Sequence, residues 1–387
     1  MRRLAVVALG CTLIALTACS EDPDAGPGPS TVTASPGDEA PTDDATDGAT
    51  GDTTGNAQPN RTPQVVAEAA TALAVPWGLG FLPDGRAVVT ERDERTVLLV
   101  DPKAPEGSRV TDAGILEEAA PQGEAGLLGV AVSPDFAENR LLYFYVTTAE
   151  DNRIVRATLD DNDRLGEPEV VLDGIPNGFI HDGGRLVFGP DGFLYVSTGE
   201  TGVGELSQDR ASLAGKILRI TPEGRPAPGN PDPDSPMWSL GHRNVQGLAF
   251  DDEGNLWASE FGASTYDELN LIRPGSNYGW PEAEGRDRSS SFVNPRVVWS
   301  TDEASPSGLA YADGRLWLAA LRGTRLWRID VDGGEVGAVR DFFVGDYGRL
   351  RTVAVAPDGM LWVTTSNRDG RGDPAETDDR ILVVDPG

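Results

Sequence analysis

The amino-acid sequence predicts an all-β domain folded as a six-bladed β-propeller. A turn followed by an alternating apolar segment occurs in six copies, roughly fifty residues apart, which is the length of a four-stranded blade. Helical periodicity is nearly absent. The 47 glycines and 29 prolines suit many short strands joined by tight turns. A long β-sandwich is the alternative, whereas the repeat is too long for a β-helix.

The copies follow one another along the chain. Each begins with a turn-forming group such as Pro-Asp-Gly or Asp-Glu-Gly, followed by β-branched and aromatic residues that favour strands. They are FLPDGRAVVTE (81–91), VSPDFAENRLLYFYVTT (132–148), FGPDGFLYVSTGE (188–200), FDDEGNLWASE (250–260), YADGRLWLAA (311–320) and VAPDGMLWVTTS (355–366). We expect the first and last strands of the domain to share a blade and close the ring. Propellers bind ligands on loops at one end of the central channel, so polar residues beside these strands are candidate functional residues.

Residues 1–18 predict a signal peptide. Two arginines precede an apolar run from Leu4 to Ala18, and this run is too short for a permanent membrane helix. The run ends in Leu-Thr-Ala-Cys, which resembles a bacterial lipobox with Cys19 as the lipidated residue. An ordinary secretory signal is the alternative.

The predicted domain boundaries follow from composition. Residues 19–60 contain Pro, Gly, Thr and nine carboxylates without any Lys or Arg. Such a segment buries too little apolar surface to offset its ordering entropy, which predicts a disordered acidic tether. Residues 61–387 form the predicted propeller domain. We expect an exported protein that is anchored to the cell membrane only through its N-terminal lipid.

Charge and cysteine content exclude several function classes. The formal net charge is −30, which argues against nucleic acid and anionic lipid surfaces as partners. The chain has two cysteines, and Cys11 lies in the predicted signal peptide while Cys19 carries the predicted lipid. The mature domain therefore has no free thiol for a disulfide, a thiolate zinc site or a cysteine nucleophile.

His181 is one of two histidines, and it stands before a glycine pair in NGFIHDGGRLVF. Its ordinary pKa suits proton transfer near neutral pH. Position alone favours a structural histidine over a catalytic one.

Six stretches carry a resemblance to a known family. They are GEAGLLGVAVSPDF (123–136), IHDGGRLVFGPDG (180–192), AGKILRI (214–220), SLGHRNVQGLAF (239–250), DELNLIRPGSNYGWP (267–281) and GRLRTVAVAPDG (348–359). In this order, across about residues 70–385, the chain resembles the soluble quinoprotein sugar dehydrogenases, the glucose/sorbosone dehydrogenase family. The resemblance implies a propeller that binds pyrroloquinoline quinone (PQQ) and Ca²⁺ and oxidises aldoses at the anomeric carbon to lactones.

The resemblance also implies which residues contact the cofactor. PQQ is a flat tricarboxylate, and guanidinium groups pair well with planar carboxylates. The matching positions are Glu124, Arg243, Asn244, Arg322, Arg349 and Arg351. Arg322 stands where the glucose-oxidising members have lysine, and Glu124 where they have glutamine. A single arginine is more often a solvated surface charge, but four from separate places in an acidic protein indicate an anion site.

For the metal, the resemblance implies backbone carbonyls of Gly262 and Ala263. Oxygen ligands of this kind suit calcium. Asp267, Glu268 and Tyr278 match positions linked in the family to a second calcium site, and solvated loop residues are the equal alternative.

For the chemistry, the resemblance implies His181 as the general base and Glu200 as its supporting carboxylate, where the family usually has aspartate. The implied partners are a small neutral sugar and an extracytoplasmic electron acceptor. Two alternatives stay open: a non-catalytic cell-surface propeller that binds glycan or protein, and a calcium-dependent lactonase. The lactonase ranks lower because its metal calls for several side-chain carboxylates.

Overall fold

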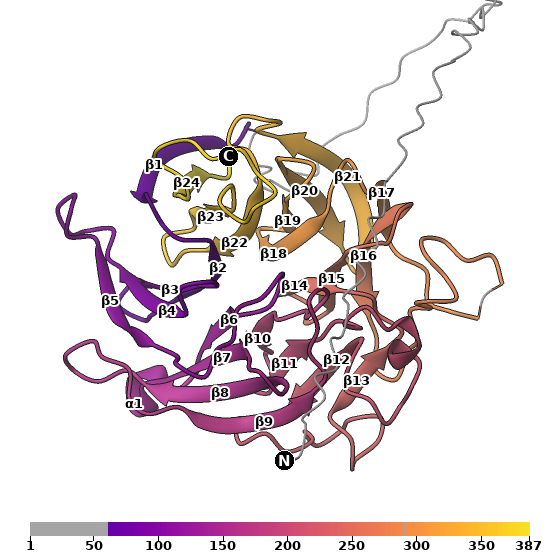
Figure 1. The fold of residues 1–387 in the computed structure, drawn as a ribbon. Helices are drawn as coiled ribbons and strands as arrows, with labels where there is room; N and C mark the ends of the chain where they lie inside the picture. The colour runs from indigo at the N-terminus through magenta and orange to yellow at the C-terminus, as the bar shows by residue number, and fades with distance from the viewer. Residues whose placement is uncertain (1–60, 290) are drawn as a thin grey trace, which may run out of the picture. The chain divides into compact units, whose positions relative to one another are not determined.

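The computed structural model describes residues 61–289 and 291–387, which form six four-stranded sheets arranged as blades in a ring (Figure 1). The predicted six-bladed propeller is confirmed. The predicted signal peptide (1–18), tether (19–60) and lipidation site Cys19 lie outside the described residues and stay predictions. The described part of the chain has no helix with the length and apolarity needed to cross a bilayer.

Each blade is an antiparallel meander whose first strand contacts the first strands of the neighbouring blades. The first three blades contain β2 (Pro76–Phe81), β3 (Ala87–Glu91), β4 (Thr96–Val100) and β5 (Val110–Ile115); β6 (Leu127–Val132), β7 (Leu141–Thr147), β8 (Asn152–Thr158) and β9 (Glu169–Ile175); and β10 (Leu186–Phe188), β11 (Leu194–Ser197), β12 (Lys216–Ile220) and β13 (Met237–Leu240). Two short helices, α1 (Phe136–Asn139) and the 3-10 helix η1 (Gly204–Ser207), interrupt the loops of these blades.

The remaining blades follow the same plan. They contain β14 (Val245–Phe250), β15 (Leu256–Glu260), β16 (Tyr266–Ile272) and β17 (Val297–Ser300); β18 (Pro306–Ala312), β19 (Arg315–Ala320), β20 (Arg325–Asp332) and β21 (Glu335–Phe342); and β22 (Leu350–Val355), β23 (Leu361–Thr365), β24 (Ile381–Asp385) and β1 (Gln64–Ala70). β1 pairs with β24, from Gln64 opposite Asp385 to Ala70 opposite Ile381. The expectation that the first and last strands share a blade is confirmed.

The repeated turns join the first and second strands of the blades. In the first blade the N–H of Leu82 donates to the carbonyl of Arg86, and Gly85 adopts a φ of 91°. The same turn recurs with Gly192, Gly254 and Gly359 at φ values of 77°, 78° and 84°. Glycine suits these places because it adopts positive φ without steric cost. In the second blade α1 replaces the glycine turn.

The hydrophobic core lies between the blades. In residues 61–289 and 291–387, six clusters of buried apolar side chains each join two or more neighbouring blades. Leu128 and Tyr143 of the second blade, for example, share a cluster with Leu194 and Leu218 of the third. Each such side chain stabilises the fold by about 1.5–3 kcal/mol when fully buried. This packing fixes the loops at the blade ends.

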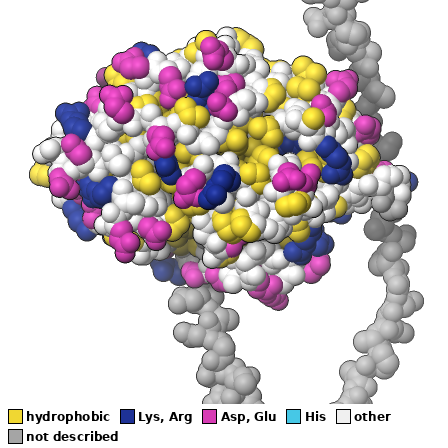
Figure 2. Space-filling model, turned by 90° about the horizontal axis from the view of Figure 1, so that it is seen from below, with side chains coloured by type: hydrophobic (Ala, Val, Ile, Leu, Met, Phe, Trp, Pro, Cys, Tyr) yellow, Lys and Arg dark blue, Asp and Glu magenta, His cyan; other side chains and the backbone are white. Residues whose placement is uncertain are grey.

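Strand direction places two kinds of loop at the same end of the ring. The segment after the second strand of a blade and the segment before its first strand both lie opposite the repeated turns. Glu200 and Arg322 belong to the first kind, while Glu124, His181 and Arg349 belong to the second. Figure 2 shows one face of the molecule, on which acidic and basic side chains are interspersed.

Candidate active site

A cavity of about 530 Å³ lies at this end of the ring, and arginines dominate its wall. It is lined by Arg92, Glu124, Gln246, Phe261, Ala263, Ser305, Leu321, Arg322, Arg349, Arg351 and Arg371. Five of the predicted site residues are therefore in the wall. Five guanidinium groups and the carboxylate of Glu124 line the cavity, and Asp93, Asp302 and Asp369 pair with four of these arginines from outside the lining. Clustered guanidinium groups of this kind suit an anionic ligand.

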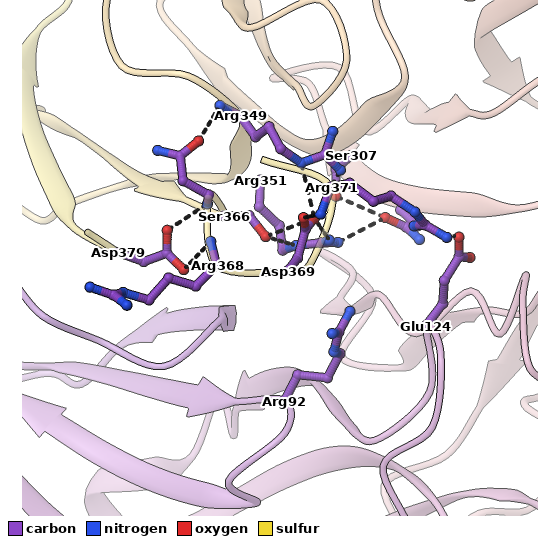
Figure 3. Close-up of polar contacts among 12 residues, drawn as sticks. Arg92, Glu124, Ser307, Arg349, Arg351, Ser366, Arg368, Asp369, Arg371 and Asp379 are labelled. Atoms are coloured by element: carbon purple, nitrogen blue, oxygen red, sulfur yellow. Dashed lines mark hydrogen bonds and ion pairs between the residues drawn. The ribbon is translucent and has the colours of Figure 1, made fainter. Parts of the chain in front are cut away.

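Arg349 and Arg351 share one carboxylate (Figure 3). Oδ2 of Asp369 lies 3.0 Å from Nε and 2.8 Å from Nη2 of Arg349, and 3.4 Å from Nη2 of Arg351. Burial on its own would raise the pKa of Asp369, but Arg351 and Arg349 lower it below its ordinary value. Burial also lowers the pKa of Arg351 to about 10, so this guanidinium stays charged at neutral pH. Two cations with one shared anion leave an excess of positive charge.

Glu124 joins the cavity to the predicted base. Its Oε1 accepts a hydrogen bond of 2.9 Å from Nη1 of Arg371, and its Oε2 accepts one of 3.0 Å from the backbone N–H of His181. Burial on its own would raise the pKa of Glu124, but these two partners lower it. Glu124 is therefore an ionised link between the cavity wall and the His181 loop.

His181 and Glu200 are brought together as predicted from the resemblance. Nδ1 of His181 lies 2.9 Å from Oε1 and 2.8 Å from Oε2 of Glu200. A carboxylate only accepts hydrogen bonds, so the neutral ring carries its proton on Nδ1. No hydrogen bond to Nε2 occurs among the described residues, which leaves this atom able to accept a proton. The Glu200 side chain is 3% exposed and His181 is 12% exposed.

Buried polar groups hold the His181 loop in place. Oδ1 of Asp182 accepts hydrogen bonds from Nδ2 of Asn152 at 2.9 Å and from the N–H of Gly178 at 3.0 Å. Oδ1 of Asn244 accepts the N–H of Gly183 at 3.1 Å. His181 itself has a φ of 60°, in the left-handed region that few non-glycine residues adopt. Asn244 thus supports the His181 loop.

The other two predicted arginines differ in their environment. The guanidinium of Arg243 lies over the Trp280 ring, 5.4 Å from its centroid, and its buried Nε has no hydrogen-bond partner among the described residues. Arg243 is not among the residues that line the cavity. Arg322 forms an ion pair of 2.6 Å with Asp302, and its side chain is 63% exposed. It therefore lies at the solvent edge of the wall.

The Gly262–Ala263 loop presents backbone oxygens. The N–H of Gly262 donates to Oδ1 of Asp267 at 2.9 Å, and the N–H of Ala263 donates to Oε1 of Glu284 at 2.8 Å. No hydrogen bond within the described chain reaches the carbonyl oxygens of Gly262 or Ala263, and Ala263 lines the cavity. Free carbonyl oxygens beside an anion cavity fit a calcium ion.

The three residues predicted for a second calcium site have separate partners. Oδ2 of Asp267 accepts the N–H of Ser305 at 2.6 Å, and burial raises the pKa of Asp267 to about 6. Glu268 accepts the N–H of Gly285 at 2.7 Å, and burial together with a neighbouring carboxylate raises its pKa to about 8. The hydroxyl of Tyr278 donates to the carbonyl of Leu271 at 2.7 Å.

These contacts do not gather the three side chains into one ligand set. Where the chain is described, no group of three or more His, Cys, Asp or Glu side chains is placed to hold a metal. The second calcium site stays a prediction.

Arg92, Gln246, Asp369 and Arg371 belong to the site but were not predicted. Arg92 directly follows β3, close to the place that Arg322 occupies after β19, so the repeat contains a signal for it. Arg371 reaches Glu124 across 247 residues of sequence. No local pattern marks such a contact.

Comparisons with known proteins agree with this geometry. The family model described as "Glucose / Sorbosone dehydrogenase" matches residues 73–376. The aldose sugar dehydrogenase YliI of Escherichia coli is 30% identical over 330 residues, which cover 76% of this chain and 88% of that protein. Quinoprotein glucose dehydrogenase B of Acinetobacter calcoaceticus is 32% identical over 253 residues, covering 57% of this chain and 52% of that protein.

Among solved structures, the PQQ-bound aldose sugar dehydrogenase of Streptomyces coelicolor is 55% identical. Its match covers 84% of this chain and 99% of that one, with a TM-score of 0.81. A glucose dehydrogenase homologue from a Thermus species, described as a possible oxidoreductase, is 44% identical with a TM-score of 0.76, covering 83% and 99% of the two chains. The family match spans most of the propeller and contains His181 and the arginines of the cavity. This chain belongs to the glucose/sorbosone dehydrogenase family.

Proposed function

We propose that this protein is a PQQ-dependent dehydrogenase that oxidises neutral aldose sugars at the anomeric carbon, with calcium at the cofactor. The observation that carries the proposal is a histidine–glutamate pair joined through Glu124 to an arginine-lined cavity. The PQQ bound to the S. coelicolor relative and the quinoprotein from A. calcoaceticus support this choice of cofactor.

The arginines are the residues that would hold the cofactor. PQQ, when bound, supplies an electrophilic quinone that accepts two electrons. Arg349 and Arg351 offer charged, forked donors for its carboxylates, and Asp369 keeps both side chains oriented.

His181 would take the proton of the anomeric hydroxyl at Nε2. Loss of this proton lets the anomeric carbon give up its hydrogen together with two electrons, and the cyclic hemiacetal becomes a lactone. Glu200 holds the ring through Nδ1 and stabilises the imidazolium that forms. General-base catalysis of this kind contributes about 10²–10⁴-fold in rate.

Calcium would bind the free carbonyl oxygens of Gly262 and Ala263. A divalent cation at this place acts as a Lewis acid for a ligand oxygen in the cavity. Carbonyl ligation and the absence of Cys or His in the loop favour calcium over a softer metal.

The proposed cellular setting rests on the predicted signal peptide and lipidated Cys19. The domain would work outside the cytoplasm, tethered to the membrane by residues 19–60. Electrons would leave to an extracytoplasmic acceptor.

The direct test is reconstitution of the purified protein with PQQ and Ca²⁺, followed by assay of artificial-dye reduction with a panel of mono- and oligosaccharides. Sugar-dependent dye reduction and lactone release are the expected results. PQQ should also raise the melting temperature, because a ligand that binds only the folded state stabilises it. A protein that binds sugar without reducing the dye would instead support the non-catalytic surface propeller.

A further inference from the structure

Glu284 accepts four consecutive backbone N–H groups with one carboxylate oxygen. Its Oε1 lies 2.8 Å from the nitrogen of Ala263, 3.1 Å from that of Ser264, 3.0 Å from that of Thr265 and 3.1 Å from that of Tyr266. Glu284 stands in the segment between β16 and β17, whereas residues 263–266 lead into β16. One carboxylate oxygen therefore holds the backbone of the whole 263–266 loop.

The two preceding amides are also engaged within the protein. The N–H of Phe261 donates to the carbonyl of Asn244 at 3.1 Å, and that of Gly262 donates to Oδ1 of Asp267 at 2.9 Å. All N–H groups from 261 to 266 thus point toward protein acceptors. The N–H and C=O of a peptide unit point in opposite directions, so fixing these amides also fixes where the carbonyls point.

Close packing supports this arrangement. A Cβ at Gly262 would collide with the carbonyl oxygen of Tyr266 and lie 2.7 Å from Oε1 of Glu284, so the approach requires glycine.

We propose that Glu284 is a positioning residue that holds the carbonyl oxygens of Gly262 and Ala263 toward the cavity for a divalent cation. This inference rests on the proposed function, because the cation is the calcium assigned there to the same loop. Glu284 would not touch the cation and would act only through the loop. Supporting groups of this kind change metal affinity by about 10–100-fold when they are removed.

The test compares Glu284→Ala, Glu284→Gln and Glu282→Ala in the full chain without cofactor. Glu282 is exposed, is two residues away and has no hydrogen bond or ion pair in the described structure, so its variant is the matched control. Amide hydrogen exchange of residues 263–266 reports whether the loop is held. Calorimetric titration with Ca²⁺ reports the affinity, and neither measurement depends on turnover.

We expect Glu284→Ala to speed amide exchange in residues 263–266 and weaken Ca²⁺ binding by about 10-fold or more. Glu284→Gln keeps an acceptor oxygen and should fall between Glu284→Ala and wild type, whereas Glu282→Ala should match wild type. Unchanged exchange in Glu284→Ala, or faster exchange with unchanged Ca²⁺ affinity, would overturn the positioning role alone. No Ca²⁺ binding by the wild-type chain would overturn this role together with the calcium part of the proposed function, and dye reduction would still test the remainder.

Discussion

Two groups of residues at the same end of the ring carry opposite charge. The base wall comprises Glu124, His181, Asp182 and Glu200, of which Glu124 lines the cavity, and its carboxylates accept hydrogen bonds from backbone amides and from the imidazole. The arginine wall comprises Arg349 and Arg351 with their shared Asp369. Arg371 crosses between them to Glu124.

Under the proposed function, this difference separates proton transfer from anion binding. The propeller fixes where each loop lies, and the residue types decide the charge that the loop offers. A base surrounded by arginines would hold its imidazolium poorly, whereas carboxylates beside it stabilise that form. Variants of the base wall should therefore lower kcat, whereas variants of the arginine wall should lower the affinity for PQQ.

The largest effect is expected from His181→Asn. Asparagine tolerates the left-handed φ of 60° at this position but offers no base, so backbone strain stays small. We expect kcat to fall by about 10²–10⁴-fold while PQQ affinity is retained. Steady-state dye reduction and a PQQ titration measure the two quantities. Near-normal kcat would remove His181 from the mechanism.

Glu200→Gln should lower kcat by about 10²-fold with unchanged PQQ affinity. An amide in place of the carboxylate can donate to Nδ1, which favours the wrong ring tautomer and removes support for the imidazolium. The pH profile of kcat should change as well, because the partner of the base is no longer charged. An identical profile in the variant and wild type would contradict the pairing.

On the arginine wall, Arg351→Met should weaken PQQ binding by about 30-fold or more, since removing one partner of a buried charge pair costs roughly 2–5 kcal/mol. The value of kcat at saturating PQQ should change little. Arg340→Met is the control, because Arg340 makes only a 3.4 Å ion pair and is 42% exposed. An equal loss of PQQ affinity in both variants would indicate a general effect of the protein's net charge.

Asp182 offers a test in stability rather than activity. Burial raises its pKa from 3.8 to about 6. The folded state therefore binds more protons than the unfolded state between these values, and stability falls as the pH rises through them. Asp182→Asn keeps an acceptor oxygen without the charge. We expect it to raise the free energy of unfolding by roughly 1–3 kcal/mol at about pH 7.5.

This gain should shrink toward zero below about pH 3, where the wild-type carboxyl is protonated in both states. Urea unfolding at the two pH values measures the difference. The same gain at both would show that burial of the charge is not its cause.

The smallest effect is expected from Arg322→Lys. The side chain is exposed and paired with an exposed Asp302, so its contribution is screened by solvent. PQQ affinity should change by less than about threefold. A larger change in PQQ affinity would indicate that Arg322 contributes to cofactor binding as a central member of the arginine wall.

The sequence predicts the fold well because its signals are local. The glycine turns at Gly85, Gly192 and Gly359 need positive φ, and the apolar alternation after them matches strands that are buried between blades. The resemblance to the family then predicts that His181 and Glu200 belong to one site. Residues that act over long separations, such as Arg371 and Glu284, carry no local signal, because an exposed charge in a loop looks the same whether or not it has a distant partner.

Closure of the ring by β1 has a consequence for how the protein is made. The blade that carries Arg349, Arg351 and Asp369 combines the first strand of the domain with its last three. During synthesis this blade can be completed only after the strands of the other five have emerged, since β24 follows all of them in the sequence. The arginine wall is therefore assembled last, and a chain lacking β1 or β24 would keep five blades without a finished arginine wall.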